Sequence, residues 1–187
     1  LYGLPAFTES VMGKMQQPLS LLMTARNDET MSKALKRAGW RETKEVRLLS
    51  VAKTINAFVF NESYPLAPIT PSFWNGRVND LNFVKPTAER TVRKRHEARF
   101  WRTDFLTEDG RRIYLGIATL TEDSRWWLIP GKGPYPDHER DGLFRDLVQA
   151  GAVMWYDRYR LVPSMSGKTL TGDRFHTDGF LYVIQLK

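Results

Sequence analysis

The residues best suited to chemistry gather in one basic, aromatic segment at positions 89–105. It holds six Lys and Arg residues, together with His96 and Trp101. Guanidinium groups bind carboxylates and phosphates through paired hydrogen bonds, and an aromatic ring stacks on a ligand or on a cation. We therefore predict that Arg95, His96, Arg99 and Trp101 contact an anionic ligand.

A second polar group lies nearer the C-terminus and combines carboxylates with a histidine. Asp137 and Arg140 stand at the start of a predicted helix, and Asp173, His176 and Asp178 stand in a polar segment. A histidine beside a carboxylate suits general acid–base catalysis. Alternatively the last two aspartates, each next to a glycine, hold a turn through side-chain-to-backbone bonds. Both interpretations stay open, and all five residues are predicted to line the ligand site.

One hydrogen-bonding arrangement is predicted for the second group. The polar segment at 170–179 is longer than a simple hairpin connection requires. We expect it to fold back over the sheet, with Asp173 or Asp178 accepting hydrogen bonds from backbone N–H groups or from Arg95 or Arg99.

Several other chemistries lack the residues they need. The chain has no cysteine, which excludes disulfides, thiolate metal sites and a cysteine nucleophile. Its three histidines show no metal-binding spacing, and no nucleophile elbow is present. Residues 167–169 match only the end of a phosphate-binding loop, because the first glycine is missing. The sequence predicts neither a metal nor a cofactor, and it leaves open whether the protein is an enzyme.

The overall charge favours acidic partners. The 187 residues carry 28 Lys and Arg against 21 Asp and Glu, a net charge of +7. Such a balance suits nucleic acid, anionic lipid headgroups or a phosphorylated ligand, or else it only keeps the protein soluble. No apolar run reaches the length of a membrane span.

The elements that must position these residues predict an α+β fold. Strands are expected at 19–24, 89–105, 112–120, 153–162 and 180–186, with the second and third forming a central hairpin. Helices are expected at 27–38, 46–60 and 137–150, where apolar residues recur at helical spacing between capping residues and glycines. The prediction is a mainly antiparallel sheet with about three helices packed on it.

The remaining segments divide the chain. Residues 1–18 are unpatterned and predict a linker or surface arm, so that residues 19–187 form a single domain. Residues 124–136 and 163–178 are rich in proline, glycine and polar residues and predict loops.

Six short stretches, in order, resemble the LssY C-terminal domain family. They are Ala38-Gly39-Trp40, residues 76–83, Arg95-His96 with residues 99–101, Tyr114-Leu115-Gly116, Asp137 with Arg140, and residues 170–173 with 177–179. The resemblance implies a domain of bacterial proteins whose other part is a membrane module, either DedA-like or a type 2 phosphatidic-acid phosphatase. It implies a position at the cytoplasmic face of the inner membrane and no particular activity.

Departures from the family pattern weaken a catalytic role. Residues 129–136 contain no histidine and no carboxylate, and Thr121 stands where members tend to have an aspartate. We therefore predict a binding or regulatory domain that recognises a phosphate-bearing lipid or glycan. The alternatives are a hydrolase acting on such a molecule and, less favoured, a nucleic-acid binding module. Expected partners are an anionic headgroup or phosphorylated small molecule, and a membrane module of the same polypeptide.

Overall fold

Strands prevail in the parts of the chain that the computed structural model describes, which are residues 3–10, 13–43, 72–87, 94–122, 131–132, 135–168 and 174–187. The helices are α1 (Asp28–Arg37) and α3 (Pro136–Gln149). The strands are β1 (Phe7–Glu9), β2 (Met15–Pro18), β3 (Leu21–Ala25), β4 (Arg41–Thr43), β5 (Phe73–Trp74), β6 (Arg77–Val78), β7 (Leu81–Pro86), β8 (Lys94–Leu106), β9 (Arg112–Glu122), β10 (Gly131–Lys132), β11 (Val153–Arg160), β12 (Met165–Lys168), β13 (Arg174–Thr177) and β14 (Phe180–Leu186).

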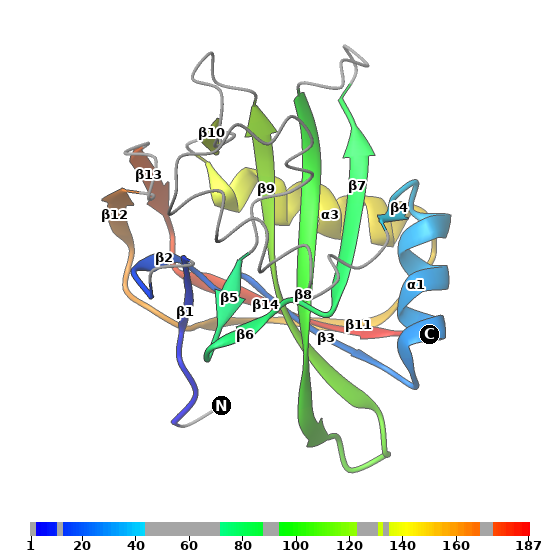
Figure 1. Ribbon diagram of the computed structural model, residues 1–187. Coiled ribbons are helices and arrows are strands. Elements are labelled where there is room, and N and C mark those ends of the chain that lie inside the picture. The colour runs from blue at the N-terminus through cyan, green and yellow to red at the C-terminus, as the bar shows by residue number, and fades with distance from the viewer. Residues whose placement is uncertain are drawn as a thin grey trace.

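The largest sheet has eight strands and organises the molecule. Its order is β11-β14-β3-β9-β8-β7-β4, with β10 added to β9. Neighbouring strands are antiparallel except β14 and β3, which are parallel. The sheet is strongly twisted, so that β7, β8 and β9 stand upright in Figure 1 while β3, β11 and β14 cross beneath them.

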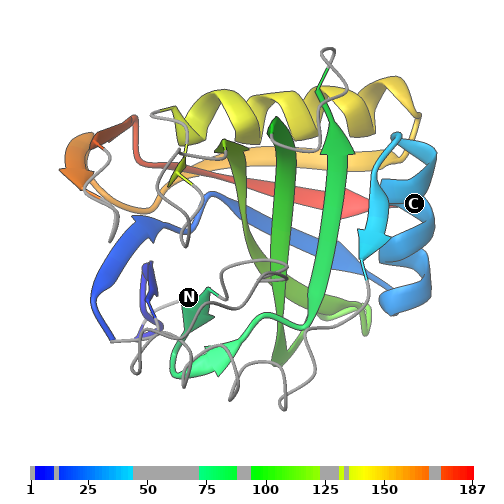
Figure 2. The same ribbon diagram turned by 45° about the horizontal axis from the view of Figure 1, so that its top comes forward.

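Two cores lie on opposite faces of this sheet. On one face, Met31 and Leu35 of α1 and Leu143 and Leu147 of α3 pack on alternate residues of β3, β7, β8, β9 and β14. On the other face, Trp74 of β5 packs with residues of β3, β8, β9 and β14. A smaller sheet of order β2-β1-β5-β6 covers that face, so the described chain forms three layers (Figure 2).

Local signals explain both helices. The side chain of Asn27 accepts a hydrogen bond from the Thr30 N–H and begins α1, and Gly39, with φ of 86°, follows its end. Helix α3 begins one residue earlier than predicted, because Pro136 occupies its first turn and Tyr135 is the cap. Asp137 therefore lies inside the first turn and is free to bond elsewhere.

The central strand presents two different faces. In β8, His96, Ala98 and Phe100 point toward the helices, whereas Glu97 and Trp101 point toward the smaller sheet. This alternation follows from the two-residue period of a strand. Strand β8 pairs with β9 from Lys94 to Leu106, which confirms the predicted central hairpin.

The expected fold class, an α+β fold with about three helices on one mainly antiparallel sheet, is wrong. The described residues are mostly strand, form three sheets and include two helices. The difference comes from strands of two to four residues, such as β5, β6, β12 and β13, which are too short for alternation to be recognised. The predicted arm at 1–18 carries β1 and β2, and the predicted helix at 46–60 lies outside the described residues.

A glycine fixes the turn between β13 and β14. Gly179 has a φ of 76°, and a Cβ there would lie 2.0 Å from the carbonyl oxygen of Val162. We expect Gly179→Ala to lower the free energy of unfolding by at least about 2 kcal/mol, because strain and overlap add. Chemical denaturation measures this loss. The matched control is Gly110→Ala, where φ is 78° but the space is open, and where a loss of only about 1 kcal/mol is expected. Equal losses in both variants would contradict the overlap.

Candidate functional site

The most extensive polar cluster surrounds Arg140, whose side chain is 1% exposed. Its guanidinium donates two parallel hydrogen bonds to Asp178, of 2.8 and 3.1 Å, and a third to the Phe180 carbonyl. Its Nε donates to Asp141 at 2.8 Å, and Asp137 lies 3.3 Å from Nη1. The Arg140 guanidinium also lies over the ring of Tyr182, 4.5 Å from its centroid. The donors of Arg140 are thus directed to protein acceptors.

The same cluster ties the turn at residues 177–180 to helix α3. Asp137 accepts hydrogen bonds from the Thr177 hydroxyl and from the Asp178 N–H, at 2.8 and 2.7 Å. Asp178 in turn accepts from the Phe180 N–H at 2.9 Å. The predicted backbone hydrogen bond to Asp178 is therefore confirmed. The arginine that joins it is Arg140, instead of the expected strand arginines.

The charge of Asp178 is favoured by these contacts. Burial by itself raises the pKa of this carboxyl, but the hydrogen bonds from Arg140 and from the Phe180 N–H outweigh it and lower the pKa below its usual value. For Arg140, burial lowers the pKa, and the bonds to Asp178 and Asp141 raise it above its usual value. Both groups are therefore charged at neutral pH.

Two of the predicted ligand arginines are engaged on the opposite face of the sheet. Glu97 is 2% exposed and accepts from Arg95 at 2.7 Å and from Arg99 at 2.5 Å. Arg99 also donates to the Ser72 hydroxyl at 2.9 Å. Burial raises the pKa of Glu97, but Arg99 and Arg95 lower it by a larger amount, so that the pKa lies below its usual value. Arg95 and Arg99 are therefore paired with Glu97 within the protein.

His96 and Trp101 have structural partners as well. His96 lies on the helix face, with its Nδ1 2.6 Å from the Glu139 carboxylate of α3. The ring of Trp40 lies beside it, with centroids 6.5 Å apart. Trp101 is 1% exposed and its Nε1 donates to the Arg77 carbonyl.

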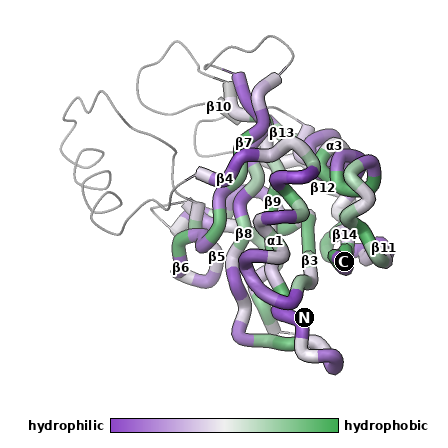
Figure 3. The backbone as a smooth tube through the Cα atoms, turned by 90° about the vertical axis from the view of Figure 1, so that its right-hand side faces the viewer, coloured by the Kyte–Doolittle hydropathy of each residue, from purple (hydrophilic) through white to green (hydrophobic). Residues whose placement is uncertain are grey.

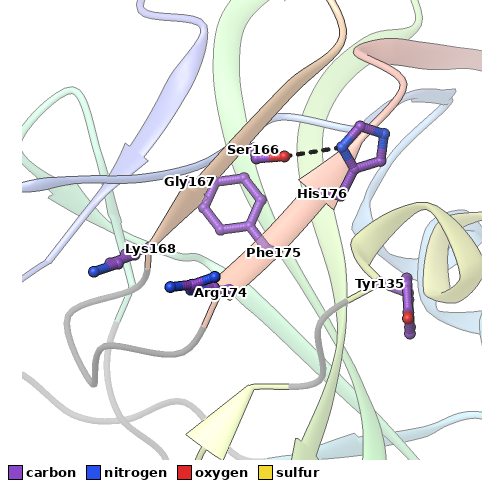
Figure 4. A pocket seen from close by; sticks show the side chains of 7 residues that line it. All are labelled: Tyr135, Ser166, Gly167, Lys168, Arg174, Phe175 and His176. Carbon is purple, nitrogen blue, oxygen red and sulfur yellow. Dashed lines mark hydrogen bonds between the residues drawn. The ribbon is translucent and has the colours of Figure 1, made fainter.

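An open pocket lies on the two-stranded ribbon of β12 and β13 (Figure 4). It has a volume of about 490 Å³ and is lined by Tyr135, Ser166, Gly167, Lys168, Arg174, Phe175 and His176. The Ser166 hydroxyl lies 3.1 Å from His176 Nδ1. Phe175 is buried against Gly167, where any Cβ would lie 2.6 Å from the ring. Gly167 therefore leaves room for the Phe175 ring on the inner side of the ribbon.

The ribbon brings two cations side by side. Ser166 pairs with His176 and Lys168 pairs with Arg174, so all four side chains project from one face. Directly opposite residues of an antiparallel pair have Cβ atoms about 5 Å apart, and like charges placed so repel each other. Figure 4 shows Lys168 and Arg174 next to each other at the end of the ribbon. Among the described lining residues there is no carboxylate to offset them.

Sequence reasoning did not select three of these pocket residues. Ser166, Lys168 and Arg174 lie in a segment predicted to be a loop. The available signal was the alternation of polar and other residues in 165–168 and 174–177, on either side of a Gly-Asp turn sequence. Four residues per strand are too few for this alternation to stand out.

The predicted site residues therefore occupy several places. Asp137, Arg140 and Asp178 meet in one cluster, Arg95 and Arg99 meet around Glu97, and His176 alone lines the pocket. Asp173 lies outside the described residues. The described part of the chain contains no group of three or more acidic, histidine or cysteine side chains arranged to hold a metal ion. None of its helices is long and apolar enough to cross a bilayer.

Comparison with known proteins decides the family. The sequence model of the family described as LssY C-terminus matches residues 1–181. The chain belongs to the LssY C-terminus family. This confirms the resemblance drawn from the sequence motifs. Neither the curated proteins nor the solved structures provided a match.

In this LssY C-terminus domain, Arg140 is expected to be a major source of stability. Replacing Arg140 with Met leaves three carboxylates without their shared cation, and we expect a loss of about 3–5 kcal/mol in the free energy of unfolding. Arg140→Lys keeps the charge but cannot make the parallel bonds, so its loss should be smaller. Urea denaturation measures both. Arg145→Met, an exposed position on the same helix, is the control and should change stability by less than about 0.5 kcal/mol. A similar value for Arg140→Met would contradict a structural role.

Acid should weaken the same cluster. The pKa of Asp178 is lowered in the folded state, so its contribution to stability is present above the unfolded pKa of about 3.9 and is lost as pH falls through the lower, folded value. Asp178→Asn cannot titrate there. We expect the variant to be less stable at neutral pH and its stability to depend less on pH below about 4. Urea midpoints measured from pH 6 to pH 3 test this, and parallel curves for both proteins would refute it.

Proposed function

We propose that the exposed face of the β12–β13 ribbon binds a phosphate-bearing group. The observation that carries the proposal is the pairing of Lys168 with Arg174, directly opposite each other, in a pocket whose described lining has no carboxylate. Neither cation makes an ion pair with the described residues. An anion between the two would replace their mutual repulsion with attraction, which no acidic side chain among the described residues does.

The neighbouring side chains suit the same ligand. The Ser166 hydroxyl donates or accepts hydrogen bonds, and His176 presents a second ring nitrogen beyond the one that faces Ser166. Tyr135, which is 66% exposed, borders the pocket from the start of α3. A volume of about 490 Å³ lies within the range of small-molecule sites. A lipid headgroup, a phosphorylated sugar or a similar phosphorylated molecule fits both the size and the charge.

This ligand class agrees with the role that the family suggests. We infer a binding or regulatory domain of a bacterial membrane-associated protein, which recognises the phosphate of a lipid or glycan. Membrane association follows in this proposal from the ligand and from a membrane module in the same polypeptide. Nucleic-acid binding is less well supported, because Arg95 and Arg99 of the basic strand are held by Glu97 and do not form a free basic surface.

A hydrolase acting on the same phosphorylated molecules is the second candidate. It is favoured by one contact, the 3.1 Å approach of the Ser166 hydroxyl to His176, since a histidine can activate a hydroxyl. The carboxylates expected to assist, Asp137 and Asp178, are directed toward Arg140 and Thr177 instead. No described carboxylate makes a hydrogen bond to His176. Binding without turnover is therefore the better-supported function.

Neutralising the two opposed cations should weaken binding. We expect Lys168→Gln/Arg174→Gln to bind phosphatidylcholine vesicles containing phosphatidic acid about five- to thirtyfold more weakly, since each charge–phosphate contact at such an exposed site contributes about 0.5–1 kcal/mol. Vesicle co-sedimentation measures this. Binding of the unchanged protein should also fall as salt rises toward 0.15 M, where charges are screened over about 8 Å.

The control removes the same charge elsewhere. Arg37→Gln/Arg41→Gln changes two exposed arginines at the opposite end of the molecule, near α1 and β4 (Figure 1). It should bind like the unchanged protein. Equal weakening in both double variants would show that net charge, and not the ribbon, governs binding. Titration with glycerol 3-phosphate separates a free phosphomonoester from a lipid surface as the source of the phosphate.

A further inference from the structure

The strand β11 forms one margin of the main sheet, and no described strand pairs with its outer edge. Among the described strands it pairs only with β14, and it is the terminal strand in the sheet order. Figure 3 shows it at the outer margin of the molecule, beyond β14. Nearly all of its residues are exposed, and four large side chains, Met154, Trp155, Tyr156 and Tyr159, are each 52–54% exposed.

This edge has only some of the features that usually protect a strand from pairing. Edge strands in monomeric proteins are short, carry charged side chains, above all lysine, or proline, or twist away at bulges. Strand β11 has eight residues with neither lysine nor proline, and its charged residues are Asp157, Arg158 and Arg160. Its pairing with β14 is regular from Trp155 to Arg160, and the only irregularity lies at its start. The Arg158 N–H donates to the Asp157 carboxylate at 2.7 Å. No described strand pairs with the other outward backbone groups, which are available to another strand.

The side chains of β11 are complementary to themselves in one antiparallel register. A twofold axis through Asp157 places Trp155 opposite Tyr159 of the second copy on one face of the sheet. On the other face it places Tyr156 opposite Arg158 of the second copy. Aromatic–aromatic and arginine–aromatic pairs of this kind stabilise neighbouring strands, and the symmetry produces each of them twice. Shifting the axis by one residue to 158 brings two Arg158 side chains together.

Helix α3 adds a second contact beside the strand. Phe144 packs on Tyr156, with ring centroids 4.7 Å apart, so this side of α3 borders β11. Val148, one helical turn further along the same side, is 48% exposed. In the twofold arrangement the two α3 helices approach each other along this border, above the joined strands. The contact is then wider than strand pairing alone.

We infer that β11 pairs with β11 of a second copy of this chain, about a twofold axis at Asp157, and joins the two main sheets into one. This inference is independent of the proposed ligand pocket, which lies on a different sheet. It assigns the exposed aromatic side chains of β11 to a subunit interface. It also predicts one unfavourable contact, because the two Asp157 carboxylates lie opposite each other at the axis.

Disulfide trapping tests the register directly, since the natural chain has no cysteine. Residues opposite each other across an antiparallel pair have Cα atoms about 4.5–5.5 Å apart, which suits a disulfide. We expect Asp157→Cys to form a covalent dimer rapidly under mild oxidation at micromolar concentration. Phe105→Cys, at a position that is 54% exposed on the β8–β9 hairpin, is the control and should react at least tenfold more slowly. Equal rates would overturn the proposal.

Sedimentation velocity gives the second measurement. The unchanged protein should show a dimer that dissociates on dilution, and Asp157→Asn should dimerise about two- to fivefold more tightly, because the like charges are removed. Trp155→Lys/Tyr159→Lys should be monomeric, whereas Phe105→Lys/Leu106→Lys, with the same number of apolar-to-lysine changes at exposed positions, should dimerise normally. A chain that stays monomeric up to about 100 times the concentration used for trapping would refute the interface.

Discussion

The structure depends on one buried guanidinium, that of Arg140. A cation removed from water is costly unless every donor finds an acceptor, and here Asp178, Asp141, Asp137 and a backbone carbonyl supply them. These acceptors belong to the start of α3 and to the turn that leads into β14. The arginine thereby fixes one end of α3 over the sheet. At the other end, Asp146 of the same helix accepts from Trp40 and pairs with a lysine of β7, so the helix is held along its length.

The basic central strand illustrates how misleading a charge count can be. In the sequence, the cations of β8 favour an anionic ligand. In the structure, the alternation of the strand places their side chains on two faces of the sheet, and acidic side chains pair with them on both. Glu97 holds Arg95 and Arg99 on one face, and Arg102 pairs with Asp28 and Asp80 on the other. Their positive charge is used within the fold. The excess positive charge behind the net value of +7 must therefore lie on other residues, and Lys168 and Arg174 of the β12–β13 ribbon are two of them.

What could be predicted from the sequence depended on the length of each element. Helix α1 and the β8–β9 hairpin have enough residues for caps and alternation to identify them, and the ordered motifs identified the family. The fold class could not be predicted, because strands of two to four residues make up two of the three sheets. The cluster of Arg140 with Asp178 joins residues 38 positions apart, and only the turn before β14 brings them together. The pocket was not predicted because its two strands have only four residues each and lie in a segment predicted to be a loop.

The Arg140 cluster and the ribbon pocket are linked by a single strand, β13. Along that strand Phe175 and Thr177 point inward, and Arg174 and His176 point outward. Because the Thr177 hydroxyl donates to Asp137 of α3, the backbone beside His176 is held by the same network that buries Arg140. The proposed binding face is built on this strand and would therefore need little ordering on ligand binding, so that less conformational entropy would be lost. The repulsion between Lys168 and Arg174 persists because the buried side of the ribbon, with Phe175 packed on Gly167, holds the two strands in register. Packing on the inner face thus keeps Lys168 and Arg174 opposite each other on the outer face, where no described residue forms an ion pair with them.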